Sequence, residues 1–194
     1  MYLYSFPIIA YLFGSISSAI VVAKLMGIKD PREVGSGNPG ATNILRYGGK
    51  KLAAITLLGD ILKGVVPVVL ARMLTQDAVI LACVAGGAFL GHLYPIFFRF
   101  QGGKGVATAL GVFVALAPWV GLALVTTWLL MAVISRYSSL SALTAAVLAP
   151  AYVWFLLPGT AYFVMSVVLA ALLVWRHRGN IRRLMKGEEG KIGK

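Results

Sequence analysis

The sequence predicts an all-α integral membrane protein with seven transmembrane helices. Of its 194 residues, 59% are hydrophobic and only 12% are charged, against about 25% charged residues in an ordinary soluble domain. The mean hydropathy is +0.86. This composition excludes a soluble enzyme and a disordered tail, and the single cysteine, Cys83, excludes a disulfide scaffold. The long apolar stretches and the placement of Lys and Arg then give the number and direction of the helices.

Three apolar stretches have the length of about 20 residues that crosses a bilayer. They are Leu3–Ala23, Leu52–Ala71 and Ala78–Phe98. No Lys or Arg precedes the first stretch, so it lacks the basic start of a cleaved signal peptide. Each stretch therefore predicts one transmembrane helix.

Two further stretches are long enough to be divided. Val106–Ser135 predicts two short helices that meet near Pro118, because proline cannot continue the helical hydrogen-bond ladder. The part before Pro118 is short enough to begin within the membrane rather than cross all of it. Ser138–Trp175 is too long for one crossing, and Leu157–Thr160 is a natural turn.

The positive charges favour two helices in Val106–Ser135. The chain has 18 Lys and Arg residues against 6 Asp and Glu residues, a net charge of +12. With seven helices and the N-terminus outside, every Lys and Arg except Lys63 and Arg72 falls on the cytoplasmic side, as the positive-inside rule requires. The sequence thus predicts one membrane domain, 1–194, whose segment 176–194 is cytoplasmic.

The first polar segment lies between two predicted helices. Its glycines let backbone N–H groups approach a ligand, and a run of such groups binds anions. Its arginine offers a planar fork for phosphate oxygens. A plain interhelical turn is the alternative, but such a link usually needs fewer residues. The candidate binding residues are Gly35, Ser36, Gly37, Asn38, Gly40, Thr42, Asn43 and Arg46.

The second polar segment ends where a new helix is predicted to begin. A helix N-terminus offers unpaired N–H groups and a positive dipole end, both of which favour phosphate. The Gly-Gly-Lys-Gly sequence at residues 102–105 does not have the spacing of a nucleotide-binding P-loop. A flexible basic loop on an anionic membrane surface is the alternative, and a structural histidine is the alternative for His92. The candidates are His92, Gly102, Gly103, Lys104 and Gly105.

The third polar segment, 176–184, begins where the last predicted helix ends. His177 and Asn180 are three residues apart and share one face of a helix. A basic helix that only anchored the chain to acidic lipids would not require this pair.

Asp60 and Lys63 lie within the second predicted helix, where ionisable residues are usually paired or functional. The sequence leaves mutual pairing and ligand contact equally open for them.

The sequence leaves few kinds of catalytic mechanism open. The carboxylates near the polar segments are too few for a magnesium site. Neither His92 nor His177 is followed five residues later by an aspartate, and Cys83 lies within an apolar stretch, so a covalent acyl-enzyme is not expected. We therefore expect positioning and charge stabilisation of two anionic reactants at the membrane surface.

Together the three segments resemble the motifs of the bacterial acyl-phosphate:glycerol-3-phosphate acyltransferases. Residues 35–46 are similar to the first motif, residues 91–108 to the second and residues 176–189 to the third, and residues 58–64 also fit. The resemblance covers almost the whole chain. One departure is Gly179. A helix former is expected at this position, and the straightness of the last helix depends on the residue found there.

The resemblance implies a multi-pass enzyme of the bacterial plasma (inner) membrane whose active site faces the cytoplasm. Such enzymes transfer a fatty acyl group from acyl phosphate to the 1-hydroxyl of glycerol 3-phosphate. The products are lysophosphatidic acid, for phospholipid biosynthesis, and phosphate. Neither acyl-CoA nor acyl carrier protein is used directly. The expected partners are acyl phosphate, glycerol 3-phosphate and the bilayer, with no cofactor, metal ion or nucleic acid.

The roles that we assign on this basis are hypotheses. Ser36 and Asn38 hold the phosphoryl group of the donor together with the backbone around them. Arg46 and Lys104 clamp phosphates and stabilise the leaving charge, and the pair His177 and Asn180 binds glycerol 3-phosphate. Asp60, Lys63 and His92 complete the set of substrate-binding candidates.

Two questions stay open at this point. Arg176 and Arg178 disfavour a positive charge on His177, so a neutral His177 could act as the general base, and the donor's own phosphate is the rival proton acceptor. An anion or phosphate-ester transporter, or a structural membrane subunit, remains an alternative to the enzyme. A transporter should carry polar residues through the helices of both halves, whereas only Asp60 and Lys63 are so placed.

Overall fold

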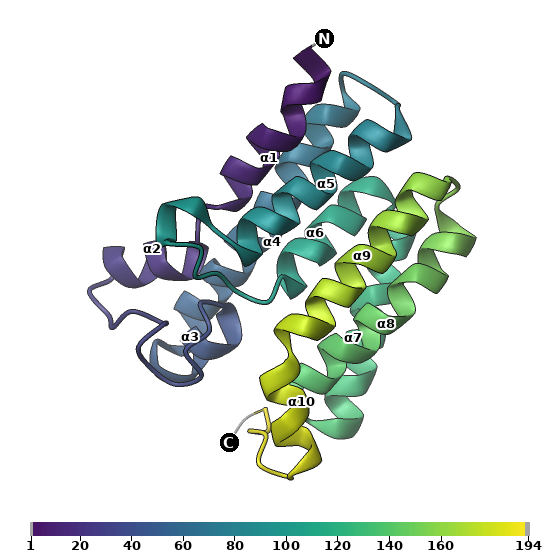
Figure 1. Cartoon of the computed structure of the whole chain (residues 1–194). Coiled ribbons are helices and arrows are strands. Elements are labelled where there is room, and N and C mark those ends of the chain that lie inside the picture. The colour runs from purple at the N-terminus through teal and green to yellow at the C-terminus, as the bar shows by residue number, and fades with distance from the viewer. Residues whose placement is uncertain (1, 193–194) are drawn as a thin grey trace.

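The computed structural model describes residues 2–192, and within that range it consists of helices and turns without a strand (Figure 1). This confirms the all-α prediction. Lys194, one of the predicted cytoplasmic charges, lies outside the described residues. The elements are η1 Tyr2–Ser5, α1 Phe6–Gly14, α2 Ser18–Leu25, α3 Ala41–Tyr47, α4 Gly49–Arg72, α5 Ala78–Leu93, η2 Ile96–Phe98, α6 Val106–Leu116, α7 Pro118–Ser135, α8 Ser138–Leu156, α9 Thr160–Arg176 and α10 Arg178–Met185.

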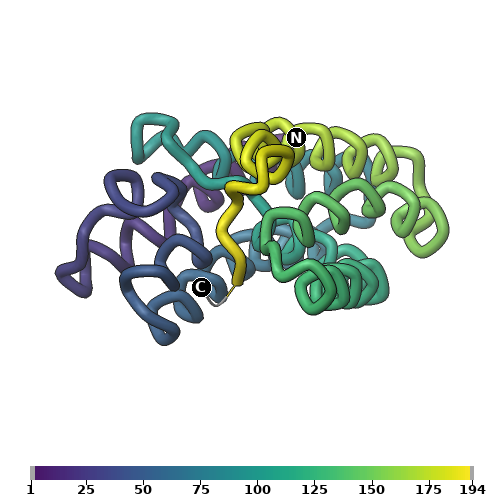
Figure 2. Tube along the Cα trace, turned by 90° about the horizontal axis from the view of Figure 1, so that it is seen from below, coloured from purple at the N-terminus to yellow at the C-terminus, as the bar shows by residue number. Residues whose placement is uncertain are grey.

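The helices form two groups with α6 between them (Figure 1). Helices α1, α4 and α5 pack together on one side, and α7, α8 and α9 pack together on the other. The two ends of the chain lie at opposite ends of the bundle (Figure 1). Figure 2 shows that the segment after α10 crosses between the two groups. The C-terminal segment therefore joins parts of the molecule that are distant in sequence.

Both predicted divisions of the long apolar stretches are confirmed. Helix α6 ends at Leu116 and α7 begins at Pro118, the first helical position, where the missing N–H of proline removes no hydrogen bond. Helix α8 ends at Leu156 and α9 begins at Thr160. Proline and glycine thus end these helices where the sequence indicated.

Length alone supports fewer spans than seven. Helix α9 has 17 residues and continues into α10 after a bend of 58°. Helix α6 has 11 residues, roughly 16 Å at the α-helical rise, which is about half of the hydrocarbon core. Five segments of the described chain are long and apolar enough to cross a membrane, and the bent pair of α9 and α10 would be a sixth. The five are Leu3–Leu25, Gly49–Arg72, Ala78–Phe98, Pro118–Ser135 and Ser138–Leu156.

The first predicted helix, Leu3–Ala23, is broken near its middle. Helix α1 ends before the break and α2 begins after it, because Ser17 has an extended backbone with φ −80° and ψ 102°. The Oγ of Ser15 donates to a carbonyl of α1 at 2.8 Å, a bond that competes with the helical ladder. The break frees the carbonyl of Ile16, which accepts a hydrogen bond from Lys63 Nζ at 3.1 Å.

Helix α6 packs against the middle of α4 with the two backbones in close contact. A Cβ added to Gly64 of α4 would lie 2.3 Å from the carbonyl oxygen of Thr108, and one added to Gly111 of α6 would lie 2.2 Å from that of Ile61. Thr108 Oγ1 also donates to the carbonyl of Asp60 at 3.0 Å. Helix α6 therefore begins beside the centre of a candidate span, not at its end.

Arg72 closes the other end of α6. Its guanidinium donates to the carbonyl oxygens of Ala115 and Leu116, the second at 3.2 Å. A helix leaves its last carbonyls without partners in its own backbone. The last residue of α4 thus fixes the C-terminal end of the short helix, whose N-terminal end carries the loop of the candidate site.

Candidate active site

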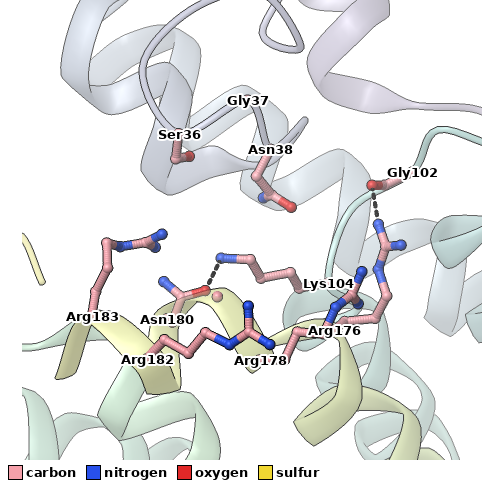
Figure 3. Close-up of a pocket in the computed structure, with 11 residues that line it drawn as sticks. Ser36, Gly37, Asn38, Gly102, Lys104, Arg176, Arg178, Asn180, Arg182 and Arg183 are labelled. Carbon is pink, nitrogen blue, oxygen red and sulfur yellow. Dashed lines mark hydrogen bonds between the residues drawn. The ribbon is translucent and has the colours of Figure 1, made fainter. Parts of the chain in front are cut away.

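A cavity of about 320 Å³ lies between the loop before α3 and the turn from α9 into α10 (Figure 3). The loop before α6 forms a third part of its wall. The structure thus brings together the three polar segments that the sequence singled out. The residues that line the cavity are Ser36, Gly37, Asn38, Gly102, Lys104, Arg176, Arg178, Gly179, Asn180, Arg182 and Arg183.

Asn43 holds the first loop in shape. Its Oδ1 accepts from the backbone N–H of Ser36 at 2.9 Å, and its Nδ2 donates to the carbonyls of Pro31 and Val34 at 2.9 and 3.0 Å. Gly35 has a φ of +60°, and a Cβ there would lie 2.3 Å from Asn43 Oδ1. Asn43 was predicted to bind substrate, but it is 1% exposed and directs its amide into the loop instead of the cavity.

The loop before α6 is held from two sides. The backbone N–H of Gly103 donates to the carbonyl of His92 at 3.1 Å, and a Cβ on Gly103 would lie 2.2 Å from His92 Nε2. On the other side, Arg176 donates through Nε to the carbonyl of Gly103 at 3.0 Å and through Nη2 to that of Gly102 at 2.7 Å. These contacts place Lys104 at the cavity wall.

Lys104 is a half-buried cation directed toward α10. Its Nζ donates to Asn180 Oδ1 at 2.6 Å (Figure 3). Burial lowers the pKa of Lys104 to about 8, and the negative charge of Glu189 opposes that shift while neighbouring arginines add to it. Lys104 is therefore mainly charged at neutral pH, and a bound anion would stabilise that charge.

Glu189 fixes the orientation of Asn180. Its Oε1 accepts from Asn180 Nδ2 at 2.6 Å and from Ser139 Oγ at 2.7 Å, while its Oε2 accepts from Arg183 Nε at 2.7 Å. Burial alone would raise the pKa of Glu189, but these hydrogen bonds outweigh it and hold the pKa below its ordinary value. Asn180 must therefore turn its Oδ1 toward Lys104.

His177 lies behind the cavity wall, in the bend between α9 and α10. It is 2% exposed and is not among the lining residues. Its Nδ1 lies 2.8 Å from the carbonyl of Leu173, which can only accept, so Nδ1 carries the proton. Burial lowers the pKa of His177 to about 4, and the charges of Lys104 and Arg176 act in the same direction. The ring is therefore neutral at neutral pH.

The cavity is strongly cationic. Figure 3 shows Ser36 and Asn38 on one side and the side chains of α10 on the other, with Lys104 between them. Five of the lining residues are Lys or Arg, and none is Asp or Glu. Guanidinium groups match phosphate oxygens in geometry as well as charge, so this arrangement can hold phosphoryl groups.

Of these cations, only Lys104 was predicted from the sequence to belong to the site. The other four cations come from the third segment, where positive charge also suits membrane anchoring, and Glu189 follows that segment in the chain. A signal was present, because residues 176, 180 and 183 have helical spacing and can share one face. The functional residues missed in this way are Arg176, Arg178, Arg182, Arg183 and Glu189.

Asp60, Lys63 and His92 form a buried cluster away from the cavity lining. Asp60 Oδ1 lies 2.9 Å from Lys63 Nζ and 3.6 Å from His92 Nδ1. None of the three lines the cavity. They were predicted as substrate-binding residues, but Asp60 and Lys63 pair with each other, as burial of opposite charges requires. The cluster lies behind the loop that His92 supports.

The remaining predicted residues do not line the cavity. Arg46 is exposed, and its Nη2 would lie 3.2 Å from a Cβ on Gly190. Gly105 has a φ of +87°, which glycine adopts at no steric cost. No group of three or more His, Cys, Asp or Glu side chains that could hold a metal ion occurs among residues 2–192. The predicted residues outside the lining are Gly35, Gly40, Thr42, Asn43, Arg46, Asp60, Lys63, His92, Gly103, Gly105 and His177.

The chain is similar to proteins of one family over nearly its full length. Residues 4–187 match the family described as glycerol-3-phosphate acyltransferase. A glycerol-3-phosphate acyltransferase of Thioalkalivibrio sulfidiphilus (strain HL-EbGR7) is 60% identical over 184 residues, which are 95% of this chain and 91% of that protein. One of Methylococcus capsulatus (strain ATCC 33009 / NCIMB 11132 / Bath) is 53% identical, over 95% of this chain and 93% of that protein.

The fold is similar to that of solved structures of an integral membrane glycerol 3-phosphate acyltransferase, PlsY (YgiH). Its glycerol 3-phosphate form has a TM-score of 0.95 and 42% sequence identity, and the match covers 100% of this chain and 96% of that chain. Its lysophosphatidic acid form has a TM-score of 0.93 and 40% identity with the same coverage.

Proposed function

Because the chain belongs to the glycerol-3-phosphate acyltransferase family, we propose that it transfers a fatty acyl group from acyl phosphate to the 1-hydroxyl of glycerol 3-phosphate. The products are lysophosphatidic acid and phosphate. The observation that carries the proposal is the meeting of three polar segments at one cationic cavity. The forms in which the solved relative is described, with glycerol 3-phosphate and with lysophosphatidic acid, agree with this substrate and product.

The reaction replaces one bond to the acyl carbon with another. The 1-hydroxyl oxygen of glycerol 3-phosphate attacks the carbonyl carbon of the acyl phosphate. The bond from that carbon to the phosphate oxygen breaks, and phosphate leaves with the electron pair. Lys104 and the arginines that α10 contributes to the cavity, Arg178, Arg182 and Arg183, stabilise the negative charge that develops on the leaving phosphate. Ser36 and Asn38, on the opposite wall, hold the phosphoryl group of the donor.

We propose that the donor's phosphate accepts the proton of the attacking hydroxyl. The ring of His177 is neutral, but its pKa of about 4 makes it a weak base, and it lies behind the lining of the cavity. The donor is a mixed anhydride, whose phosphoryl group is less basic than that of a phosphate ester. As its bond to the acyl carbon breaks, it becomes inorganic phosphate, and the departing phosphate is then the stronger base of the two. In this mechanism His177 supports the bend that places Asn180 at the cavity.

We further propose seven crossings of the bacterial plasma (inner) membrane, with the N-terminus outside and the cavity facing the cytoplasm. The opposite placement of the chain ends supports an odd number of crossings (Figure 1). Helix α10 has eight residues, three of them arginines, so it suits the cytoplasmic surface and not the hydrocarbon core. Helix α6 would cover the outer half of the membrane only.

An assay with purified protein in detergent tests the proposed reaction. With acyl phosphate and glycerol 3-phosphate, we expect phosphate release in equal amount to lysophosphatidic acid. Glycerol, which lacks the phosphate that the cavity would bind, should give little product, and acyl-CoA should not replace the donor. Phosphate release that does not require glycerol 3-phosphate would contradict the proposal. Solute flux in vesicles without acyl transfer would contradict it in favour of a transporter.

A further inference from the structure

Arg176 joins two parts of the cavity wall that belong to different helices. It is the last residue of α9, and its guanidinium bonds the carbonyls of Gly102 and Gly103 at 2.7 and 3.0 Å. Lys104, the next residue of that loop, donates to Asn180 of α10 at 2.6 Å. Two adjacent links therefore tie the 102–104 loop to the bend between α9 and α10.

The other arginines of the cavity are bonded differently. Arg183 donates to Glu189, and Arg178 lies over the ring of Trp175 at 4.7 Å. Only Arg176, among the cavity arginines of the described chain, donates hydrogen bonds to the loop before α6. The ring of Tyr94 lies 5.5 Å from its guanidinium carbon. Its Nε and one Nη are thus used within the protein.

The two carbonyl contacts have an electrostatic consequence. A carbonyl oxygen carries partial negative charge, so bare carbonyls beside the cavity would repel a phosphoryl group. The planar fork of arginine satisfies both carbonyls with adjacent N–H groups, which the single ammonium of lysine cannot do in the same geometry. The same contacts hold the backbone immediately before Lys104.

We propose that Arg176 is a positioning residue for acyl transfer, acting through Lys104 by holding the carbonyls of Gly102 and Gly103. The expected effect of Arg176 on the kinetics of acyl transfer rests on the proposed function. The loop and the helix bend are aligned by Arg176, and Lys104 then meets both Asn180 and the phosphate. Loss of Arg176 leaves Lys104 charged but misplaced.

A double-mutant cycle tests whether Arg176 acts through Lys104. Arg176→Gln alone should lower kcat/KM by about ten- to a hundredfold, the range for a lost hydrogen bond to a charged group. In a Lys104→Gln background the same substitution should cost less than about threefold, because coupled residues are not additive. If the losses in kcat/KM of the two single variants multiply in the double variant, Arg176 acts independently of Lys104. That result would overturn the proposal.

A second measurement does not depend on catalysis. Hydrogen exchange of the backbone amides of residues 101–105 should be at least about tenfold faster in Arg176→Gln, because the loop opens more easily. Unchanged exchange would overturn the proposal even if activity fell. An inactive wild type would defeat the proposed function, and the exchange result would still decide the role of Arg176.

Two further variants separate geometry from charge. Arg176→Lys should stay at least about fivefold below wild type in kcat/KM, because lysine lacks the fork. Recovery to wild-type activity would show that charge alone matters and would overturn the proposal. Arg99→Gln is the matched control, since Arg99 is an exposed arginine of the same connection. It should keep activity within about twofold, and a loss equal to that of Arg176→Gln would overturn the specific role.

Discussion

Lys104 and Asn180 are 76 residues apart in the sequence, and a hydrogen bond of 2.6 Å joins their side chains. The amide of Asn180 is fixed at its other end by Glu189, again at 2.6 Å. The ammonium of Lys104 and the carboxylate of Glu189 are thus linked through one amide. This link holds a cation at the cavity wall without a direct ion pair, so the charge of Lys104 remains available to an anion.

The activity of the free enzyme should decline as the pH rises through about 8. Burial lowers the pKa of Lys104 to about 8, so the ammonium is present below that pH and is lost above it. Since kcat/KM reports the ionisations of the free enzyme, it should fall by about tenfold per pH unit above the pKa. The measurement is kcat/KM for phosphate release from pH 6 to 10 at constant ionic strength.

Lys104→Arg is the control for this pH dependence. A guanidinium stays charged throughout the range, so the decline near pH 8 should disappear, although the activity at pH 7 is lower. Ionisation of the substrates is common to both proteins and cancels in the comparison. If kcat/KM of Lys104→Arg declines near pH 8 as in the wild type, the decline is due to a group other than Lys104.

Asn43→Ala should weaken both the fold and substrate binding. The substitution leaves the carbonyl of Pro31 and the N–H of Ser36 without their partner, and the carbonyl of Val34 keeps only its hydrogen bond from the backbone N–H of Gly37. Each buried group without a partner costs about 1–3 kcal/mol, so the melting temperature should fall and the KM for acyl phosphate should rise. Leu45→Ala, a truncation at a 42% exposed position of α3, is the control. A fall in kcat alone, with KM and melting temperature unchanged, would argue for direct participation in the reaction.

Gly64→Ala should separate α6 from α4 and disturb the loop that α6 carries. The added Cβ would lie 2.3 Å from the carbonyl oxygen of Thr108, and such overpacking costs about 1–3 kcal/mol. We expect a lower melting temperature and a lower kcat/KM. Gly86→Ala is the matched control, because a Cβ at Gly86 of α5 meets nothing within 4 Å. It should leave activity intact and stabilise the helix slightly. Equal behaviour of the two variants would show that the close contact is unimportant.

The sequence predicted features that depend on local chemistry. Pro118 and the turn at Leu157–Thr160 end helices because their own backbones forbid or disfavour continuation, and both breaks were placed correctly. The break at Ser15–Ser17 was missed, since serine is common within membrane helices. It depends on contacts across the bundle, such as the hydrogen bond from Lys63 to Ile16.

The same distinction applies to the site. The glycine-rich loops were recognised because their composition alone suits phosphate. Asn38 and Asn43 were indistinguishable in sequence, and only the folded loop shows that Asn38 faces the cavity while Asn43 is buried. The roles of Arg176 and Glu189 depend on partners 74 and 50 residues away, which no local pattern identifies.

The proton acceptor is the point at which His177 can be tested most directly. A general base contributes about 10²- to 10⁴-fold to the rate. Asparagine could retain a hydrogen bond to the carbonyl of Leu173 through its Nδ2, as His177 does through Nδ1. If the donor's phosphate accepts the proton, His177→Asn should lower kcat at saturating substrate by less than about a hundredfold.

The size of the loss and its pH dependence distinguish the two mechanisms. Because burial lowers the pKa of His177 to about 4, a base role would produce a loss of activity as the pH falls through that value, and His177→Asn would remove it. With the phosphate as acceptor, the acidic decline belongs to the substrate and should remain in the variant. His177→Ala, which loses the bond to Leu173 as well, should be less stable than His177→Asn by about 1 kcal/mol. A kcat reduced more than about a hundredfold in a folded His177→Asn variant, together with a vanished acidic decline, would establish His177 as the base.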